Sequence, residues 1–176
     1  DLVTGVQTCA LPISRMKGET MNTHGQAKLP LYFPALAPLH DNLSGYAYPL
    51  IRFVAGATLV PHGAQKLFEW FGGNTAGTAA FFSKFGLEPA LQLVYLTGAI
   101  EFFGGILLAI GLFTRPAAAI IFGMLTVAWY TVHLGNGFFW TKGGIEYPLM
   151  WSLIALGFAF GGGGRMSLDA KLGREV

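Results

Sequence analysis

Charged and titratable side chains interrupt two long apolar segments of this sequence. Arg52, His62 and Lys66 lie in the first segment, and Glu101 lies near the middle of the second. Within a lipid bilayer such groups are costly unless they are paired or hydrated, so each is a candidate functional residue. At about 100° per residue the three side chains of the first segment share one helical face, and charge balance predicts that Glu101 pairs with one of them. The pairing is either a structural ion pair that fixes helix register or part of a polar pocket that binds a small ligand or relays protons.

A second polar group lies in the third apolar segment, where His133 follows two aromatic residues. Aromatic residues at this depth are ordinary interface anchors, which is the simpler interpretation. His62, Lys66 and His133 are nevertheless expected toward the same end, and hydrogen-bond donors among flat apolar walls would suit a quinone headgroup. A haem bound by His62 and His133 is less favoured, because two histidines alone do not define a haem site. No catalytic residue and no metal ligand is assigned, and the ligand-pocket candidates are Arg52, His62, Gln65, Lys66, Glu101 and His133.

The composition requires an apolar environment for these groups. Of the 176 residues, 53% are hydrophobic and 11% are charged, whereas soluble domains carry about 25% charged residues. So few charges cannot cover a soluble globule, which indicates a protein embedded in the lipid bilayer. The net charge of +2 and the lack of a basic cluster argue against nucleic acid as a partner.

The single cysteine, Cys9, lies in a segment that we exclude from the fold. Residues 1–15 lack an initiator Met and resemble a translated sequencing adapter, so residues 1–20 are interpreted as a non-native leader. Without Cys9 the chain cannot bind a Cys-ligated iron–sulfur cluster or zinc ion, or attach a c-type haem.

Four long apolar segments predict an all-α polytopic membrane protein, a bundle of four transmembrane helices. They cover about 45–68, 89–113, 116–135 and 145–161, each close to the roughly 20 residues that a bilayer requires. The predicted organisation is a cytoplasmic N-terminal tail (21–44), a transmembrane domain (45–164) and a cytoplasmic C-terminal tail (165–176).

The connections and small residues specify how this bundle is assembled. A short amphipathic helix or a loop packed over the bundle end is expected between the first and second helices, and Thr114–Pro116 should form the tight turn between the second and third. Close helix packing is assigned to Gly56, Gly63, Gly104 and Gly105. Six Lys and Arg residues fall on one side of this layout and three on the other, which predicts that both termini are cytoplasmic.

Three runs of the sequence resemble the DoxX family of bacterial membrane proteins. They are YPLIRFVAGATLVPHGAQKLF, TGAIEFFGGILLAIGLFTRPAA and the Gly-rich segment that ends in Ser167–Asp169. The resemblance implies a four-helix bundle in the bacterial cytoplasmic (inner) membrane. It also implies a link to redox physiology, because members are associated with thiosulfate:quinone oxidoreductase, oxidative-stress complexes or quinone and catechol tolerance.

The leading hypothesis is therefore a membrane subunit or accessory protein of a quinone-linked redox or oxidative-stress system. Any enzymatic activity would belong to an oxidoreductase complex with a soluble or membrane redox partner. Two alternatives remain open at this point. One is a non-catalytic scaffold that anchors a soluble partner, and the other is a small-molecule carrier, which four helices could form only as a homo-oligomer.

Overall fold

The computed structural model describes residues 31–175, and that range contains helices and connecting segments but no strand. The prediction of an all-α fold is confirmed. The chain divides after Gly45 into two compact units, and the site described below lies entirely within the second. The proposed leader and residues 21–30 of the predicted tail lie outside the described residues.

Helix α1 (Ala37–Phe68) is longer than the first predicted helix. It follows a short 3-10 turn, η2 (Pro34–Leu36), so residues 37–44 of the predicted tail are helical. Proline is tolerated in this first turn because the amide N–H groups there have no intrahelical partner. The domain boundaries themselves stay predictions.

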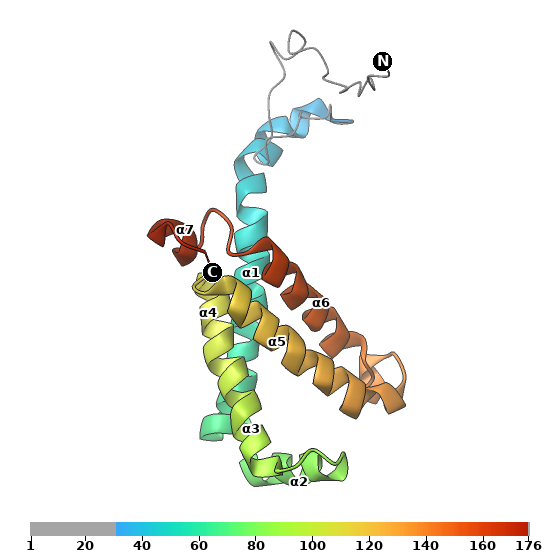
Figure 1. Cartoon of the computed structure of the whole chain (residues 1–176). Helices are drawn as coiled ribbons and strands as arrows, with labels where there is room; N and C mark the ends of the chain where they lie inside the picture. Colours follow the sequence, from blue (N-terminus) through green and yellow to red (C-terminus); the bar gives the residue numbers. More distant parts are fainter. Residues whose placement is uncertain (1–30, 176) are drawn as a thin grey trace, which may run out of the picture. The chain divides into compact units, whose positions relative to one another are not determined.

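A short helix, α2 (Thr75–Lys84), fills the connection that was predicted as a helix or a loop. It follows the 3-10 turn η3 (Trp70–Gly72), and its N-cap is Asn74, whose side chain accepts a hydrogen bond of 2.7 Å from the Gly77 amide. Such a cap satisfies an N–H group that the first helical turn leaves unpaired. Figure 1 shows α2 lying crosswise at the end of α3.

The second and third long helices each contain a π-helical turn. The second consists of α3 (Ala90–Ala99), the π-helical η4 (Ile100–Gly104) and α4 (Gly105–Ile110). The third consists of α5 (Thr114–Ala128), the π-helical η5 (Trp129–His133) and the 3-10 turn η6 (Leu134–Asn136). After η7 (Trp140–Lys142), helix α6 (Glu146–Gly161) packs along α5, and the chain ends in the short α7 (Leu168–Leu172) (Figure 1).

The turn between the second and third helices was predicted at the wrong residues. It is formed by residues 111–113, and Thr114 already begins α5. Gly111 ends α4 with φ +73°, a conformation that glycine adopts readily. The Asp169 carboxylate accepts hydrogen bonds from the Phe113 and Thr114 amides at 2.8 and 2.9 Å, which lets α5 begin two residues before Pro116.

Glycines allow α1 to cross the second long helix closely. A Cβ at Gly63 would lie 2.6 Å from the Gly98 carbonyl oxygen, and one at Gly105 would lie 2.8 Å from that of Gly56. Both spacings are tighter than side chains tolerate, so Gly56, Gly63 and Gly105 lie at the crossing. Gly104 instead faces α5, where its Cβ would lie at an ordinary 3.4 Å from Ile121.

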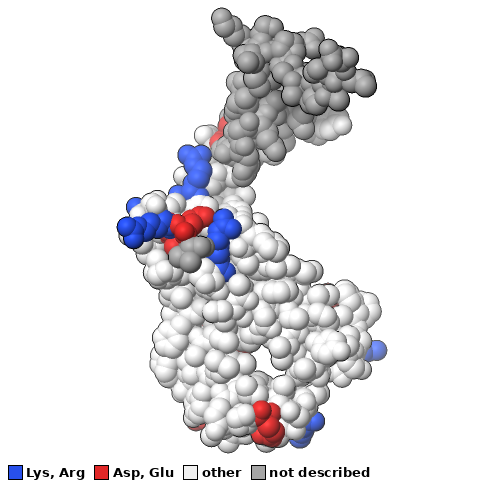
Figure 2. Space-filling view, in the orientation of Figure 1, with Lys and Arg blue, Asp and Glu red and all other residues white. Residues whose placement is uncertain are grey.

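Two of the helical segments are long and apolar enough to cross a membrane. They are Ala90–Ile110 and Thr114–Asn136, so the count of four transmembrane helices is not confirmed. Helix α6 has only 16 residues, fewer than the roughly 20 that a bilayer requires. Large apolar side chains are nevertheless exposed on all the long helices, including Phe53, Phe103, Ile120 and Leu153. Figure 2 shows a broad band of the second unit without charged side chains on the visible face, as expected of a surface against lipid.

Candidate functional site

The candidate site is a cavity of about 420 Å³ between α1, α3, η4, α5, η5 and α6, with α2 at one end. Most of its wall is apolar, from residues such as Leu59, Leu93, Leu125 and Val132. Its polar side chains include Thr58, His62, Lys66, Thr97, Glu101 and His133. An apolar cavity with a few convergent polar groups is the usual form of a small-molecule site, and this volume lies within the typical range of about 300–1,000 Å³.

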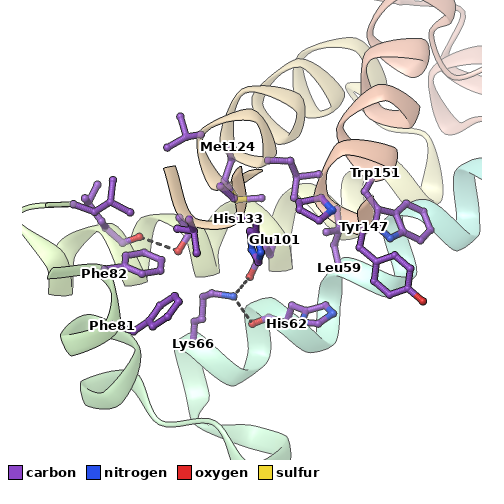
Figure 3. Close-up of a pocket in the computed structure, with 18 of the residues that line it drawn as sticks. Leu59, His62, Lys66, Phe81, Phe82, Glu101, Met124, His133, Tyr147 and Trp151 are labelled. Atoms are coloured by element: carbon purple, nitrogen blue, oxygen red, sulfur yellow. Dashed lines mark hydrogen bonds and ion pairs between the residues drawn. The ribbon is translucent and has the colours of Figure 1, made fainter. Parts of the chain in front are cut away.

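An ion pair between α1 and η4 forms the polar centre of the cavity. The Lys66 Nζ lies 2.7 Å from Glu101 Oε2 and also donates a longer hydrogen bond of 3.4 Å to the His62 carbonyl oxygen (Figure 3). The side chains of Lys66 and Glu101 are 18% and 12% exposed, so the pair is largely enclosed but not sealed. Of the three partners considered for Glu101, the structure places Lys66 against it.

Both π-helical turns carry a polar residue of this cavity. Glu101 lies in η4 and His133 lies in η5. His133 Nδ1 is 2.6 Å from the Gly143 carbonyl oxygen, a contact that fixes the ring and requires a proton on Nδ1, leaving Nε2 as an acceptor when the ring is neutral. Single π turns often mark functional sites, because the wider turn redirects a side chain. Sequence periodicity did not reveal them, since it assumed a regular α-helix.

Aromatic side chains that the sequence did not assign to the site form the cavity walls. Phe81 and Phe82 come from α2, and Tyr147 and Trp151 come from α6. Figure 3 shows the two phenylalanines on one side of the Lys66–Glu101 pair and Trp151 on the other. The short amphipathic helix considered for the connection between the first and second helices was the available signal for Phe81 and Phe82. No pattern distinguished Trp151 from the other apolar residues of α6.

Arg52 does not join this cluster. It is 3% exposed, and it donates hydrogen bonds to the carbonyl oxygens of Gly163 and Met166, at 3.1 Å for the second. These carbonyls follow the C-terminus of α6, where a positive charge is favourable. Gln65 also lies outside the cavity, with its side chain donating to the Phe71 carbonyl at 3.3 Å. His62, Lys66, Glu101 and His133 are thus brought together, and Arg52 and Gln65 are not.

The Arg52 end of the bundle is a separate polar cluster. Asp169, 5% exposed, accepts hydrogen bonds from Thr114 Oγ1 and from two backbone amides. Burial raises the pKa of Asp169, but the hydrogen bonds from Thr114 and Phe113 and the nearby charge of Arg52 hold it below its usual value. Tyr48 adds a hydrogen bond of 2.7 Å to the Gly162 carbonyl. These contacts attach the segment after α6 to α1 and to the start of α5.

No group of three His, Cys, Asp or Glu side chains that could hold a metal ion occurs among residues 31–175. The side chains that line the cavity provide hydrogen-bond donors, one carboxylate and aromatic walls. This combination can hold a planar, polar-edged molecule.

Comparison with known proteins identifies relatives of this chain. A Haemophilus influenzae protein described as uncharacterized is 36% identical over 129 residues, which cover 72% of this chain and 90% of the relative. The "Putative oxidoreductase CatD" of Bacillus subtilis is 32% identical over 120 residues, covering 68% of this chain and 82% of the relative. No solved structure matches the chain at a significant level. The model of the membrane-associated DoxX family matches residues 48–134, which include His62, Lys66, Glu101 and His133, and the chain belongs to the DoxX family.

Proposed function

We propose that this protein is a multi-pass membrane subunit or accessory protein of a quinone-linked redox or oxidative-stress system, and that its cavity binds a quinone or a similar small aromatic molecule. The observation that carries the proposal is the Lys66–Glu101 ion pair, which opens onto a cavity with aromatic walls. The relative named as an oxidoreductase supports the redox assignment.

Each part of the cavity has a role in this proposal. A quinone accepts electrons when it is bound, and its carbonyl oxygens accept hydrogen bonds. Lys66 donates to one carbonyl oxygen, and His62 is the second candidate donor. Glu101 is the counter-ion of Lys66 and a proton acceptor. Phe81, Phe82 and Trp151 provide flat apolar surfaces for the ring.

The proposed placement is the bacterial cytoplasmic membrane with both termini in the cytoplasm. The exposed basic residues at the α7 end are Arg165, Lys171 and Arg174, with the half-exposed Arg115 beside them, whereas Lys84 and Lys142 lie toward the α2 end. An excess of Lys and Arg favours the cytoplasmic side. Electrons would come from a soluble or membrane redox partner, since the described residues offer hydrogen-bonding groups and no thiol.

The test measures the binding of a short-chain ubiquinone to the protein in lipid nanodiscs. Quenching of tryptophan fluorescence reports the binding. Lys66→Gln should weaken binding about 10- to 150-fold, which corresponds to one charge-assisted hydrogen bond of about 1.5–3 kcal/mol. The matched control is Lys142→Gln, the same change at an exposed residue on the same end of the bundle. Equal affinities of the two variants would refute the proposal.

Mass spectrometry of the protein extracted in mild detergent provides a second test. A stoichiometric quinone that Glu101→Gln loses, while Glu175→Gln retains it, would support the proposed site. Glu175 is a suitable control because it forms a half-exposed ion pair with Arg115 at the α7 end. An empty bundle that co-purifies with a soluble protein would instead favour a non-catalytic scaffold.

A further inference from the structure

A second cavity adjoins the proposed ligand site. Its volume is about 390 Å³, and it lies between the end of α1, the turn after it and the first part of α2. In contrast to the ligand cavity, its wall is dominated by polar side chains and glycine backbone. The lining residues are Gln65, Lys66, Gly72, Gly73, Asn74, Gly77, Thr78 and Phe81.

The two cavities share two lining residues, Lys66 and Phe81. Lys66 pairs with Glu101 on the side of the ligand cavity. Phe81 extends from α2 beside the Lys66 side chain (Figure 3). These two side chains therefore lie where the polar cavity and the apolar cavity meet.

The polar cavity is held in place by specific contacts. The Thr75 hydroxyl donates a hydrogen bond of 2.9 Å to the Lys66 carbonyl oxygen, which ties the start of α2 to the end of α1. A Cβ at Gly73 would lie 2.8 Å from Gln65 Cα, so only glycine lets the connecting turn pass so close to α1. These contacts fix the turn and the start of α2 beside the second cavity.

A cavity of this size and polarity suits ordered water, because each water needs two to four polar partners and this wall supplies them. The Thr78 hydroxyl donates to the Asn74 carbonyl at 2.8 Å and keeps its own acceptor capacity, and the glycine backbone groups add further partners. Ionisable groups within membranes typically face such water-filled cavities. Water on one face of Lys66 would lower the desolvation cost of keeping this ion pair charged.

We propose that this second cavity is a water-filled vestibule that gives the Lys66–Glu101 pair access to the aqueous phase on the α2 side, with Phe81 and Lys66 separating it from the ligand cavity. The other titratable groups at the ligand cavity are His62 on α1 and His133 on η5. If the ligand is a quinone, the vestibule determines the side of the membrane with which its protons are exchanged. That consequence rests on the proposed function, whereas the access route does not.

The experiment is cysteine labelling in a Cys9→Ser background, because Cys9 is the only cysteine of the sequence. Inside-out and right-side-out vesicles are treated with a negatively charged, membrane-impermeant methanethiosulfonate. Thr78→Cys, which lines only the vestibule, should be labelled from the same side as Lys142→Cys and not from the side of Lys171→Cys. Labelling of Thr78→Cys from the α7 side, or from neither side, would overturn the proposal.

The partition is tested by a second cysteine, Thr97→Cys, which lines only the ligand cavity. It should escape the reagent while Phe81 is present and become labelled from the α2 side when Phe81→Ala is added. Phe82→Ala is the matched control, because this neighbouring phenylalanine lines the ligand cavity but not the vestibule. Equal labelling of Thr97→Cys with either alanine variant would refute the role of Phe81.

These outcomes are independent of quinone binding. If Thr78→Cys is labelled as expected but no quinone binds in nanodiscs, the vestibule stands and the proposed function fails. If quinone binds to the wild-type protein in nanodiscs while Thr78→Cys shows no α2-side access, the proposed function stands and the vestibule fails. Thermal stability of each variant in detergent shows which proteins are folded and can be compared.

Discussion

Replacement of Gly63 by alanine tests the helix crossing that positions the ion pair. An alanine Cβ at this position would lie 2.6 Å from the Gly98 carbonyl oxygen and 2.7 Å from Phe102 Cβ. Ordinary van der Waals contact begins at about 3.4 Å and the Phe102 amide nitrogen is nearer still, so α1 and the second helix would have to separate by at least about 0.8 Å. Overpacking of this kind destabilises proteins by about 1–3 kcal/mol.

A matched variant isolates this effect from helix propensity. Gly123→Ala makes the same change in the interior of α5, where nothing lies within 4 Å of the new Cβ. Both variants gain about 0.5–1 kcal/mol from the lower backbone entropy of alanine, so their difference reports the clash alone. We therefore expect Gly63→Ala to unfold at a midpoint about 2–12 °C below that of Gly123→Ala, using about 2–4 °C per kcal/mol.

The assay is thermal unfolding of both proteins in the same detergent. Tryptophan fluorescence reports the unfolding midpoint. Gly63 precedes Lys66 by one turn, and Gly98 lies one turn before Glu101, so the same separation should also weaken the 2.7 Å ion pair and any ligand that depends on it. If Gly63→Ala is as stable as Gly123→Ala, the close crossing of the two helices is refuted.

Three further predictions concern the polar cluster at the α7 end. Tyr48→Phe removes the 2.7 Å hydrogen bond to the Gly162 carbonyl and should lower the free energy of unfolding by about 0.5–1.5 kcal/mol, measured by thermal unfolding; an unchanged midpoint would contradict this contact. Arg52→Met keeps an apolar stem but removes the hydrogen bonds to Gly163 and Met166, so trypsin should cleave faster after the exposed Arg165 than in the wild type; an equal rate would show that Arg52 does not hold this segment. Asp169 has a folded-state pKa below its unfolded value, so its stabilising contribution is complete above about pH 4 and is lost as the pH falls through the folded-state value. Asp169→Asn should therefore be less stable at neutral pH and lose less stability on acidification, and parallel pH profiles of the two proteins would refute this assignment.

The sequence located the long helices from their apolar runs, and it predicted the ends of α6 most closely. Helix α6 was expected over 145–161 and is found at Glu146–Gly161. The boundary at Thr114 was missed because it depends on Asp169, which is 55 residues away in the chain. Local patterns cannot report a cap supplied from so far along the sequence.

The polar residues of the site were found because charge is conspicuous in an apolar segment, but their grouping was not fully predictable. Arg52 and Lys66 share a helical face on α1, yet they lie four turns apart and meet different partners. Arg52 finds backbone carbonyls after α6, whereas Lys66 finds a carboxylate. The aromatic walls were harder still, since Trp151 is one apolar residue among many in α6 and only its tertiary neighbours distinguish it.

The sequence left two interpretations of the Lys66–Glu101 pair, a structural bridge or a functional pocket, and the surroundings of the pair support the proposed pocket. A pair that only fixes helix register is most stable when packed side chains enclose it and every polar group is satisfied within the protein. Here both side chains line a cavity, and Lys66 also lines a second, polar one. The glycine crossing one turn away and the Arg52 cluster at the opposite end also hold the helices in place. An ion pair that lines an apolar cavity and also adjoins a polar one supports the proposal of a functional pocket.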